Sequence, residues 1–370
     1  MFIKNLKLEN YRNFEALEIE LEAKPGIQIF LGQNAQGKTN LLESIFLLSF
    51  PRSFRASSPN DLIRFKQNHF IIEGGFSDFD LKFGYQKTPI RRTYQKNKNE
   101  VSLQEFLTTV QTVLFTPEDV EILNDSPSER RRLIDTILSQ IDRDYFLDLI
   151  HFTKILKQRN ALLKRIKDRK ATVAELGYWD KEFAKTAAAI HLKRHELVEY
   201  FGTHLAEFYR LIAGDEIAEV SLKFAFSGHS RIEKTKDYNY EDVILELLFD
   251  DRKYETEVGH TTVGPHRDDL TLFLNGKSVS EFCSRGEKRS FMLVLKMIEL
   301  EFLAAKSGRK PILLLDDVFS ELDLNRRTAL LKLSEKYQTL ITTVEKSYFK
   351  DFKGDLNLFN FDKNSVLKYN

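Results

Sequence analysis

The stretch FLGQNAQGKTNLLES, residues 30–44, decides the fold class. Its central part, GQNAQGKT, satisfies the pattern G-x-x-x-x-G-K-[ST]. A short apolar run of strand type precedes the loop at 27–31, and apolar residues at helical spacing follow it at 41–48. A lone polar loop could be a surface turn, but a loop placed between a strand and a helix predicts a phosphate-binding site.

The residue types in this loop suit a nucleoside triphosphate. Glycines allow backbone N–H groups to curl around phosphate oxygens, Lys38 can neutralise the β- and γ-phosphates, and the Thr39 hydroxyl can bind Mg²⁺. The residues predicted to bind ATP here are Gly32, Gln33, Asn34, Ala35, Gln36, Gly37, Lys38, Thr39 and Asn40.

A pair of acids supplies the second half of such a site. Residues 312–315 form an unbroken apolar run, typical of a strand that is buried on both faces of a parallel sheet, and Asp316 and Asp317 follow it. Asp316 would hold Mg²⁺, and Asp317 would orient or deprotonate the attacking water. Alone, the two acids could be a strand-to-turn cap, whereas together with the loop they favour catalysis.

Most of the chain lies between Lys38 and Asp316, which suits an ABC-type ATPase head with an insertion better than a compact kinase or small GTPase. The proline-free run 129–213 is predicted to be helical throughout, with a polar break at 167–170 that indicates an antiparallel hairpin. Residues 70–103 are expected to be antiparallel β, with turns at Gly74-Gly75 and 96–99, and Ser126 and Glu129 have the spacing of a capping box.

The predicted fold class is therefore α/β. It is a P-loop ABC-type ATPase head, with a mixed sheet plus an antiparallel β region, and carries an inserted α-helical lobe. We expect residues 1–125 to form the N-terminal part of the head, 126–215 the helical lobe, and 216–370 the C-terminal part of the head.

A second candidate anion site precedes the acidic strand. The segment Ser284, Arg285, Gly286 and Glu287 leads into an amphipathic helix, and a serine at a helix start can bind an anion or simply cap the helix. This segment is too far along the chain to serve the same nucleotide easily. In ABC-type ATPases such a signature completes the site of a second copy, which predicts a head-to-tail homodimer with two ATP molecules between the subunits.

Composition restricts the kind of protein further. The 370 residues are 42% hydrophobic and carry a net charge of +1, so a large core is expected and any basic binding face must be local. The single cysteine, Cys283, excludes an internal disulfide framework. The N-terminus has no signal-like apolar region and nothing approaches a membrane span, so we expect a cytoplasmic protein without a membrane partner.

Five segments together resemble the RecF family of bacterial recombination mediators. They are GQNAQGKTNLLE (32–43), FTPEDVEILNDSPSERRRLID (115–135), TTVGPHRDDL (261–270), SRGEKR (284–289) and LLLDDVFSELD (313–323). The resemblance implies an ATPase that dimerises on binding ATP and Mg²⁺. It also implies binding to double- and single-stranded DNA at gaps or junctions, partnership with RecR and RecO in recombinase loading, and slow DNA-stimulated hydrolysis. Gap repair, replication-fork recovery and the SOS response are the processes implied.

The resemblance also assigns roles to individual residues. Ser284 and Gly286 match the signature, Ser320 and Asp323 match the D-loop that couples the two sites, and Arg12 and Arg55 resemble arginines near the nucleotide or the dimer contact. Glu287 stands where transporters have glutamine, and Thr343 stands where many have a switch histidine. Because threonine cannot act as a charged γ-phosphate sensor, slow turnover is expected.

Basic clusters are the candidate DNA contacts, although each could be a solvated face. One cluster lies in 154–170 and the other in 87–98, and the predicted contacts are Lys157, Arg159, Lys164, Arg165, Arg91 and Arg92. One of Arg130, Arg131 and Arg132 is also a candidate to face ATP or DNA. His260 and His266 lack a third ligand at useful spacing, so packing or hydrogen bonding is expected of them.

Two other classes share some of these features. The ATPase subunit of an ABC transporter would want the glutamine and the switch histidine that this chain lacks. An SMC-type structural clamp would need hundreds of residues of heptads, far more than the predicted lobe supplies.

Overall fold

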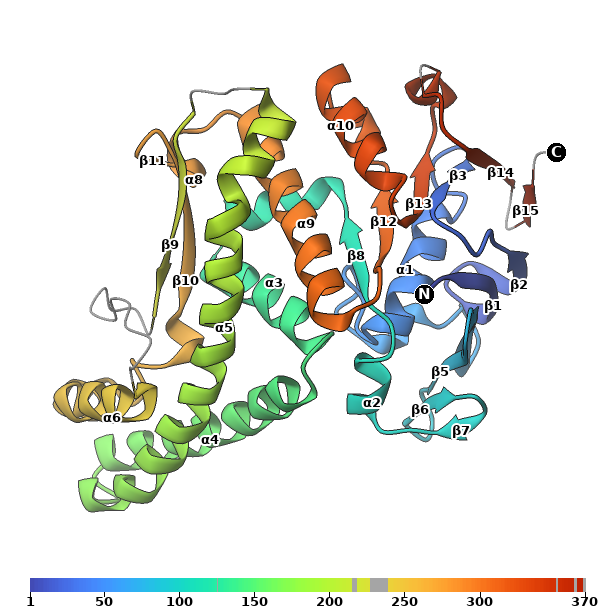
Figure 1. Cartoon of the computed structure of the whole chain (residues 1–370). Coiled ribbons are helices and arrows are strands. Elements are labelled where there is room, and N and C mark those ends of the chain that lie inside the picture. The colour runs from blue at the N-terminus through green and yellow to red at the C-terminus, as the bar shows by residue number, and fades with distance from the viewer. Residues whose placement is uncertain (125, 215–217, 227–238, 351, 363–364, 369–370) are drawn as a thin grey trace. The chain divides into compact units, whose positions relative to one another are not determined.

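The computed structural model describes residues 1–124, 126–214, 218–226, 239–350, 352–362 and 365–368 (Figure 1). The chain divides into two compact units, each built from separate segments. The first comprises Met1–Val120, Glu207–Ile217 and Ser284–Asn370, and the second comprises Glu121–Ala206 and Ala218–Cys283.

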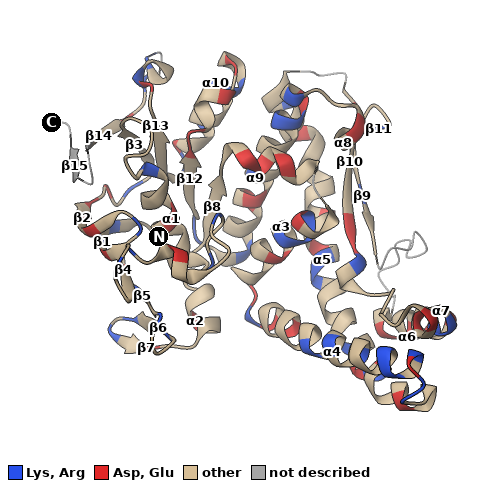
Figure 2. Cartoon of the chain, turned by 180° about the vertical axis from the view of Figure 1, so that it is seen from behind, with Lys and Arg blue, Asp and Glu red and all other residues tan. Residues whose placement is uncertain are grey.

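A largely parallel sheet is the centre of the first unit. Its order is β15-β14-β3-β13-β12-β8, and all neighbouring pairs are parallel except β14 with β15 (Figures 1 and 2). Two of its strands, β3 and β12, carry the apolar runs that the sequence analysis identified at 27–31 and 312–315. The strands are β3 (Gly26–Leu31), β8 (Thr112–Phe115), β12 (Ile312–Asp316), β13 (Gln338–Thr343), β14 (Leu356–Asp362) and β15 (Ser365–Lys368).

The second sheet of this unit is antiparallel, in the order β2-β1-β4-β5-β6-β7. Its strands are β1 (Ile3–Tyr11), β2 (Phe14–Glu20), β4 (His69–Phe76), β5 (Asp80–Gln86), β6 (Arg91–Lys96) and β7 (Asn99–Glu100). The predicted turn between β6 and β7 is confirmed, but the one at Gly74-Gly75 is wrong, because both glycines lie within β4 and pair with β1 and β5. A Cβ on Gly75 would lie 2.6 Å from the Asn5 side chain, so close packing explains this glycine.

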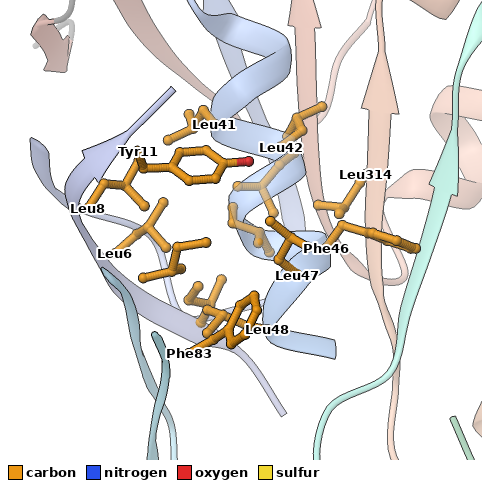
Figure 3. Packing of buried hydrophobic residues seen from close by; sticks show 14 of the residues in the cluster. Leu6, Leu8, Tyr11, Leu41, Leu42, Phe46, Leu47, Leu48, Phe83 and Leu314 are labelled. Atoms are coloured by element: carbon orange, nitrogen blue, oxygen red, sulfur yellow. The ribbon is translucent and has the colours of Figure 1, made fainter. Parts of the chain in front are cut away.

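Helix α1 (Lys38–Ser49) lies in the core between the two sheets. In Figure 3, Leu6, Leu8 and Tyr11 of β1 approach it on one side and Leu314 of β12 on the other. Ten of its twelve residues are buried, so the helix is covered on all sides and not along one apolar face alone. This position fixes the start of α1, and with it the end of the glycine-rich loop, at the carboxyl edge of the parallel sheet.

Three further α-helices and several short 3₁₀ helices (η) belong to the first unit. Helix α9 begins at Arg285 and ends at Ser307, and Gly308 follows it in the left-handed conformation that ends many helices. The others are η1 (Pro59–Leu62), α2 (Leu103–Leu107), η5 (Val318–Glu321), α10 (Leu324–Ser334) and η6 (Lys346–Phe349), while η2 (Pro117–Leu123) crosses into the second unit.

The second unit contains the predicted helical region. Contacts between the two long helices α4 and α5 run in opposite order, with Phe152 against Phe183 and Arg159 against Asp180, so the hairpin is antiparallel. The run is not continuous, because residues 140–142 separate α3 from α4. The elements are α3 (Pro127–Ser139), α4 (Arg143–Lys167), η3 (Val173–Glu175), α5 (Leu176–Ala213), β9 (Val220–Ala225), α6 (Tyr240–Asp250), α7 (Arg252–Val258), η4 (Pro265–Arg267), β10 (Asp269–Leu274), β11 (Lys277–Ser278) and α8 (Val279–Phe282). The part of α5 from Glu207 onward groups with the first unit.

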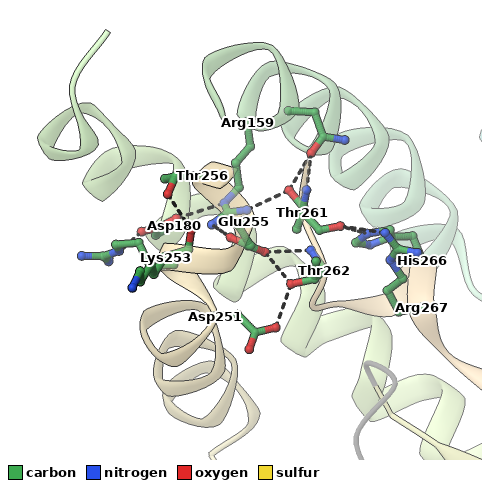
Figure 4. Close-up of polar contacts among 12 residues, drawn as sticks. Arg159, Asp180, Asp251, Lys253, Glu255, Thr256, Thr261, Thr262, His266 and Arg267 are labelled. Carbon is green, nitrogen blue, oxygen red and sulfur yellow. Dashed lines mark hydrogen bonds and ion pairs between the residues drawn. The ribbon is translucent and has the colours of Figure 1, made fainter. Parts of the chain in front are cut away.

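The described residues of 218–283 group with the helices, although the expected boundary placed this segment in the head. Part of the reason is a buried charge network (Figure 4). The fully buried Arg159 of α4 donates to Asp180 of α5 at 3.0 Å, to Glu255 of α7 at 2.6 Å and to Thr261 at 2.7 Å. A buried arginine needs all of these partners, so the segment that supplies Glu255 and Thr261 is fixed to the hairpin.

Among the described residues, no helix combines the length and apolar character that a membrane crossing requires.

Candidate nucleotide-binding site

The glycine-rich loop leads directly into α1. Gly37 stands just before the helix with φ 106°, and a Cβ there would lie 2.6 Å from the Asn13 side chain. Only glycine suits both the backbone conformation and the close approach. Lys38 is 7% exposed, and its ammonium donates to the carbonyl oxygens of Gly32 and Gln33, at 2.7 Å each. The loop is therefore curled back over its own lysine.

The structure brings Thr39 and Asp316 together, although they are 277 positions apart in the chain. The Thr39 hydroxyl donates to Oδ1 of Asp316 at 2.9 Å, and the Thr342 hydroxyl donates to the same oxygen at 2.6 Å. The parallel pairing of β12 with β13 sets Asp316 opposite Thr342. Burial raises the pKa of Asp316, and these two hydrogen bonds oppose that effect.

Asp317 begins the turn after β12, with its backbone in the left-handed region at φ 52°. Its N–H donates to the Thr342 carbonyl oxygen at 3.0 Å, which fixes this conformation. Its Oδ1 is buried and has no hydrogen-bond partner among the described residues. Burial raises its pKa, against the opposing charge of Lys38.

The ammonium of Lys38 and the two carboxylates thus share one small region. Burial lowers the pKa of Lys38, and the charges of Asp317 and Asp316 oppose this shift. A buried cation beside a loop of backbone N–H groups fits a polyphosphate. A hydroxyl beside a carboxylate, with the orphan oxygen of Asp317 next to them, offers the oxygen ligands that Mg²⁺ prefers.

Glu43 of α1 is the centre of a second polar group, which the sequence analysis did not single out. Its fully buried carboxylate accepts two hydrogen bonds from Arg12, both at 2.8 Å, and further ones from Tyr11 and Ser53, both at 2.6 Å. Arg55 is 3.3 Å away. Burial by itself would raise the pKa of Glu43, but the hydrogen bonds from Arg12, Ser53 and Tyr11 outweigh it and lower the pKa.

This group is joined to the glycine-rich loop by a chain of amides. Arg55 donates to Asn40 at 2.6 Å, Asn40 donates to Asn13 at 2.5 Å, and Asn13 donates to the carbonyl oxygen of Gln36 at 3.3 Å. Arg12 and Asn13 occupy the turn between β1 and β2. The two predicted arginines, Arg12 and Arg55, are therefore held beside the loop by side chains of α1.

The signature segment lies at the start of α9. The Ser284 N–H and hydroxyl both donate to one carboxylate oxygen of Glu287 at 2.7 Å, and the Glu287 N–H donates to the Ser284 hydroxyl at 3.3 Å, which completes a capping box. Ser284 and Arg285 are exposed. By contrast, the capping box predicted at Ser126 does not form, because the Ser126 hydroxyl instead contacts Ser128.

The D-loop residues connect the signature helix with the acidic pair. The Ser320 hydroxyl donates to the carbonyl oxygen of Asp317 at 2.8 Å, and Asp323 caps α10. Arg289 pairs with Glu321, and Arg326 donates to Ser290 of α9 at 2.7 Å. The start of α9, the D-loop and the end of β12 are thus linked within the first unit.

The predicted DNA contacts fall into two groups. Lys157, Lys164 and Arg165 of α4 are exposed, as are Arg91 and Arg92 of β6. Arg159 is wrong as a DNA contact, because its guanidinium is buried in the network of Figure 4 and cannot meet a phosphate. It occupies the inward face of α4, which a count of basic residues does not reveal.

Arg130 and Arg131 anchor the segment at 261–270. Arg130 pairs with Asp269 at 2.7 Å, and Arg131 donates to the Asp268 carbonyl oxygen at 2.7 Å. Burial lowers the pKa of His266 to about 4, and this ring contacts the Thr261 carbonyl oxygen at 3.1 Å. Two of the five sequence blocks therefore contact each other within the second unit.

The parallel sheet, the loop before α1 and the acid at the end of β12 define a P-loop ATPase head of the ABC type. A family model of the RecF/RecN/SMC N-terminal domain matches residues 2–365. The DNA replication and repair protein RecF of Caldanaerobacter subterraneus subsp. tengcongensis is 37% identical over 361 residues, 96% of each chain. The RecF protein of Staphylococcus carnosus is 37% identical over the full length of both. The chain belongs to the RecF family of DNA replication and repair proteins.

Solved structures agree with this assignment. The structure of the recombination mediator protein RecF with ATP, from the RecFOR pathway, has a TM-score of 0.89 and 34% identity, and the match covers 100% of this chain and 98% of that one. The Smc head domain of Pyrococcus furiosus has a TM-score of 0.55 at 17% identity, with coverage of 100% and 96%, and shares the fold alone.

Proposed function

We propose that this chain is an ATP-driven DNA-binding switch of recombinational gap repair. It binds ATP with Mg²⁺, dimerises head to tail, and binds gapped or junction DNA in the cytoplasm. With RecR and RecO as partners it promotes recombinase loading, and slow, DNA-stimulated ATP hydrolysis ends the dimeric state. The observation that carries the proposal is the hydrogen bond between Thr39 of the glycine-rich loop and Asp316.

The residues of the first unit support distinct roles in this reaction. Lys38 and the N–H groups of the loop hold the β- and γ-phosphates, and Thr39 and Asp316 hold Mg²⁺. When bound, Mg²⁺ neutralises charge that develops on the phosphate oxygens. Asp317 accepts a proton from, or orients, the attacking water, because its Oδ1 has no hydrogen-bond partner among the described residues and can accept from that water.

The signature segment supports the dimer. Ser284 and Arg285 are exposed at the start of α9, where a second copy can reach them. To bind the γ-phosphate of that copy, Ser284 exchanges its hydrogen bonds to Glu287 for the phosphate. Because a carboxylate already satisfies these donors, the exchange has a cost that favours slow cycling.

The test is purified protein with ATP, Mg²⁺ and short DNA. We expect an ATP-dependent shift from monomer to dimer in light scattering, DNA binding that weakens with salt, and modest stimulation of hydrolysis by gapped DNA. Lys38→Met abolishes the shift, whereas Asp317→Asn leaves ATP binding intact and traps the dimer. An unchanged monomer in every nucleotide state, or DNA binding that ignores ATP, contradicts the proposal.

A further inference from the structure

Two loops lie side by side at one rim of the antiparallel sheet. The first follows η1 and comprises 64–68, and the second connects β5 to β6 and comprises 87–90. Asn68 joins them, because its side chain donates to the Thr88 carbonyl oxygen at 2.8 Å and accepts from the Thr88 N–H at 3.1 Å. The Lys87 N–H also donates to the Asn68 carbonyl oxygen at 2.8 Å. We call residues 64–68 and 87–92 the rim surface.

Each loop exposes one large apolar side chain. Phe65 is 84% exposed and Ile90 is 78% exposed, the two highest values among the large apolar residues that the structure describes. Exposure of this extent on hydrogen-bonded neighbouring loops differs from the scattered, partly covered apolar residues of an ordinary surface.

The charges around these two side chains are mostly positive. The rim surface carries Arg64, Lys66, Lys87, Arg91 and Arg92 and no acid. Three acids lie against it, namely Glu15, which pairs with Arg64 at 3.0 Å, Glu100, which pairs with Arg91 at 3.1 Å, and Asp61 beside the first loop. Lys66, Lys87 and Arg92 are exposed, so an excess of positive charge faces solvent.

We propose that the rim surface binds single-stranded DNA, with an unpaired base stacked on Phe65 and the strand's phosphates neutralised by Lys66, Lys87 and Arg92. The proposal rests on the proposed DNA-binding function and names the surface that reads the unpaired strand. An exposed aromatic ring surrounded by cations is the arrangement that proteins use for single strands, because every base has a face that can stack. A duplex, whose bases are already stacked, would need only the cations.

The first loop is fixed to the residues beside the candidate ATP site. The Arg12 N–H donates to the Leu62 carbonyl oxygen at 2.8 Å, and its guanidinium donates to the Asp61 carbonyl oxygen at 3.1 Å. The Arg64 N–H donates to the Asn10 carbonyl oxygen at 2.8 Å. Phe65 therefore follows a segment that the β1–β2 hairpin holds on its N-terminal side, while Asn68 is held by the β5–β6 loop on the other side.

The test compares two substitutions at one position in the full-length protein, with ATP and Mg²⁺ present. Binding of a fluorescently labelled oligo(dT) is followed by anisotropy. Phe65→Leu, which keeps apolar bulk but removes the ring, is expected to weaken binding about tenfold, whereas Phe65→Tyr keeps binding within about twofold. The control Phe249→Leu removes a 66% exposed phenylalanine elsewhere and is expected to leave binding unchanged.

A second readout reports stacking directly. Trp179 is the single tryptophan, so the double variant Trp179→Phe, Phe65→Trp carries one reporter at the rim surface. We expect oligo(dT) to quench its fluorescence and blunt duplex of equal length to leave it largely unchanged. Lys87→Gln and Arg92→Gln are each expected to reduce the slope of log binding constant against log salt by about 0.7.

The outcomes separate this inference from the proposed function. If the unchanged protein binds no DNA in any nucleotide state, the proposed function fails. If the unchanged protein binds DNA and Phe65→Leu binds single strands with the same affinity, the rim surface is not the binding site. An acidic protein then becomes the better partner for the rim surface. Equal losses for single strands and blunt duplex would overturn the stacking role of Phe65.

Discussion

Glu43 explains how two arginines from different segments are held at the glycine-rich loop. Arg12 comes from the β1–β2 turn and Arg55 from the chain after α1, and the same buried carboxylate contacts both. Because Tyr11 and Ser53 donate to it as well, its charge is fully compensated. We infer that Glu43 is a positioning residue, which orients Arg12 and Arg55 without touching the nucleotide.

Glu43→Gln should lower the free energy of unfolding by about 3 kcal/mol at pH 7, because it removes one partner of a buried ion pair. The pKa of Glu43 is lowered in the folded state, so its stabilising effect is full above the unfolded carboxyl pKa and is lost as the pH falls through the lowered value. The difference from the unchanged protein should therefore shrink in acid. Urea denaturation at several pH values measures it.

The matched control is Glu18→Gln. Glu18 pairs with Lys7 at 2.7 Å, but its side chain is 60% exposed, so the change should cost less than about 0.5 kcal/mol. Equal losses for the two variants at pH 7 would contradict the role given to Glu43.

Residue types and spacing predicted the phosphate-binding loop and the acidic pair. Only the fold could reveal the residues that support them. The loop at 32–39 and the acids Asp316 and Asp317 carry their chemistry in short motifs. Glu43 and Thr342 belong to no motif that reveals their roles, because those roles come from contacts with distant segments. Arg159 was assigned to DNA because a run of cations does not tell which one faces inward.

Arg159→Ala should destabilise the second unit by about 3–5 kcal/mol, because it leaves Glu255 and Asp180 as buried carboxylates without their main partner. Lys157→Ala, two residues earlier on the exposed face, should change stability by less than about 0.5 kcal/mol. Thermal unfolding of the two variants gives the comparison. A small effect of Arg159→Ala would show that the network is not a major support of this unit.

At the scale of elements, the segment around η4 is expected to respond to pH. The pKa of His266 is lowered to about 4, so the fold favours the neutral ring. Its contribution to stability is full above about pH 6.5 and is lost as the pH falls toward 4, on the order of 3 kcal/mol in all. Unfolding free energies measured from pH 7 to 4 should decline less steeply for His266→Gln than for the unchanged protein.

His260→Gln is the matched control, since this exposed histidine lies at the other end of the same segment. Its pH profile should follow that of the unchanged protein. Identical profiles for all three proteins would contradict the burial argument for His266.

Most elements of the first unit could be predicted from the sequence. The spacing of apolar residues there agrees with the glycine and proline positions that end helices and strands. The strand before the loop, α1, the helix after the signature segment, and β12 all appear as expected. Gly74-Gly75 was misread as a turn because a packing glycine and a turn glycine look alike in a sequence. The capping box at Ser126 failed because spacing does not determine which acceptor a serine meets.

At the scale of the molecule, the second unit differs most from expectation. The sequence suggested one inserted helical lobe, but the unit also contains the three-stranded sheet β11-β10-β9 and the helices α6 and α7. Buried pairs between segments far apart in the chain hold it together, among them Arg194 with Asp135 and Asp268. Such pairings depend on tertiary contacts, so composition and periodicity cannot reveal them.

The central claim for the whole molecule is that each ATP lies between two copies of the chain. Ser284→Arg tests it most directly, because Ser284 is exposed and lies outside the contacts of the Lys38, Thr39 and Asp316 group. The measurement is molar mass by light scattering with ATP and Mg²⁺, together with ATP affinity by calorimetry. Thr328→Arg, at an exposed position of α10, is the control.

We expect Ser284→Arg to bind ATP as tightly as the unchanged protein but to remain a monomer, while Thr328→Arg dimerises normally. If Ser284→Arg forms the ATP-dependent dimer with undiminished strength, the second copy does not use this segment, and the shared-site account is wrong.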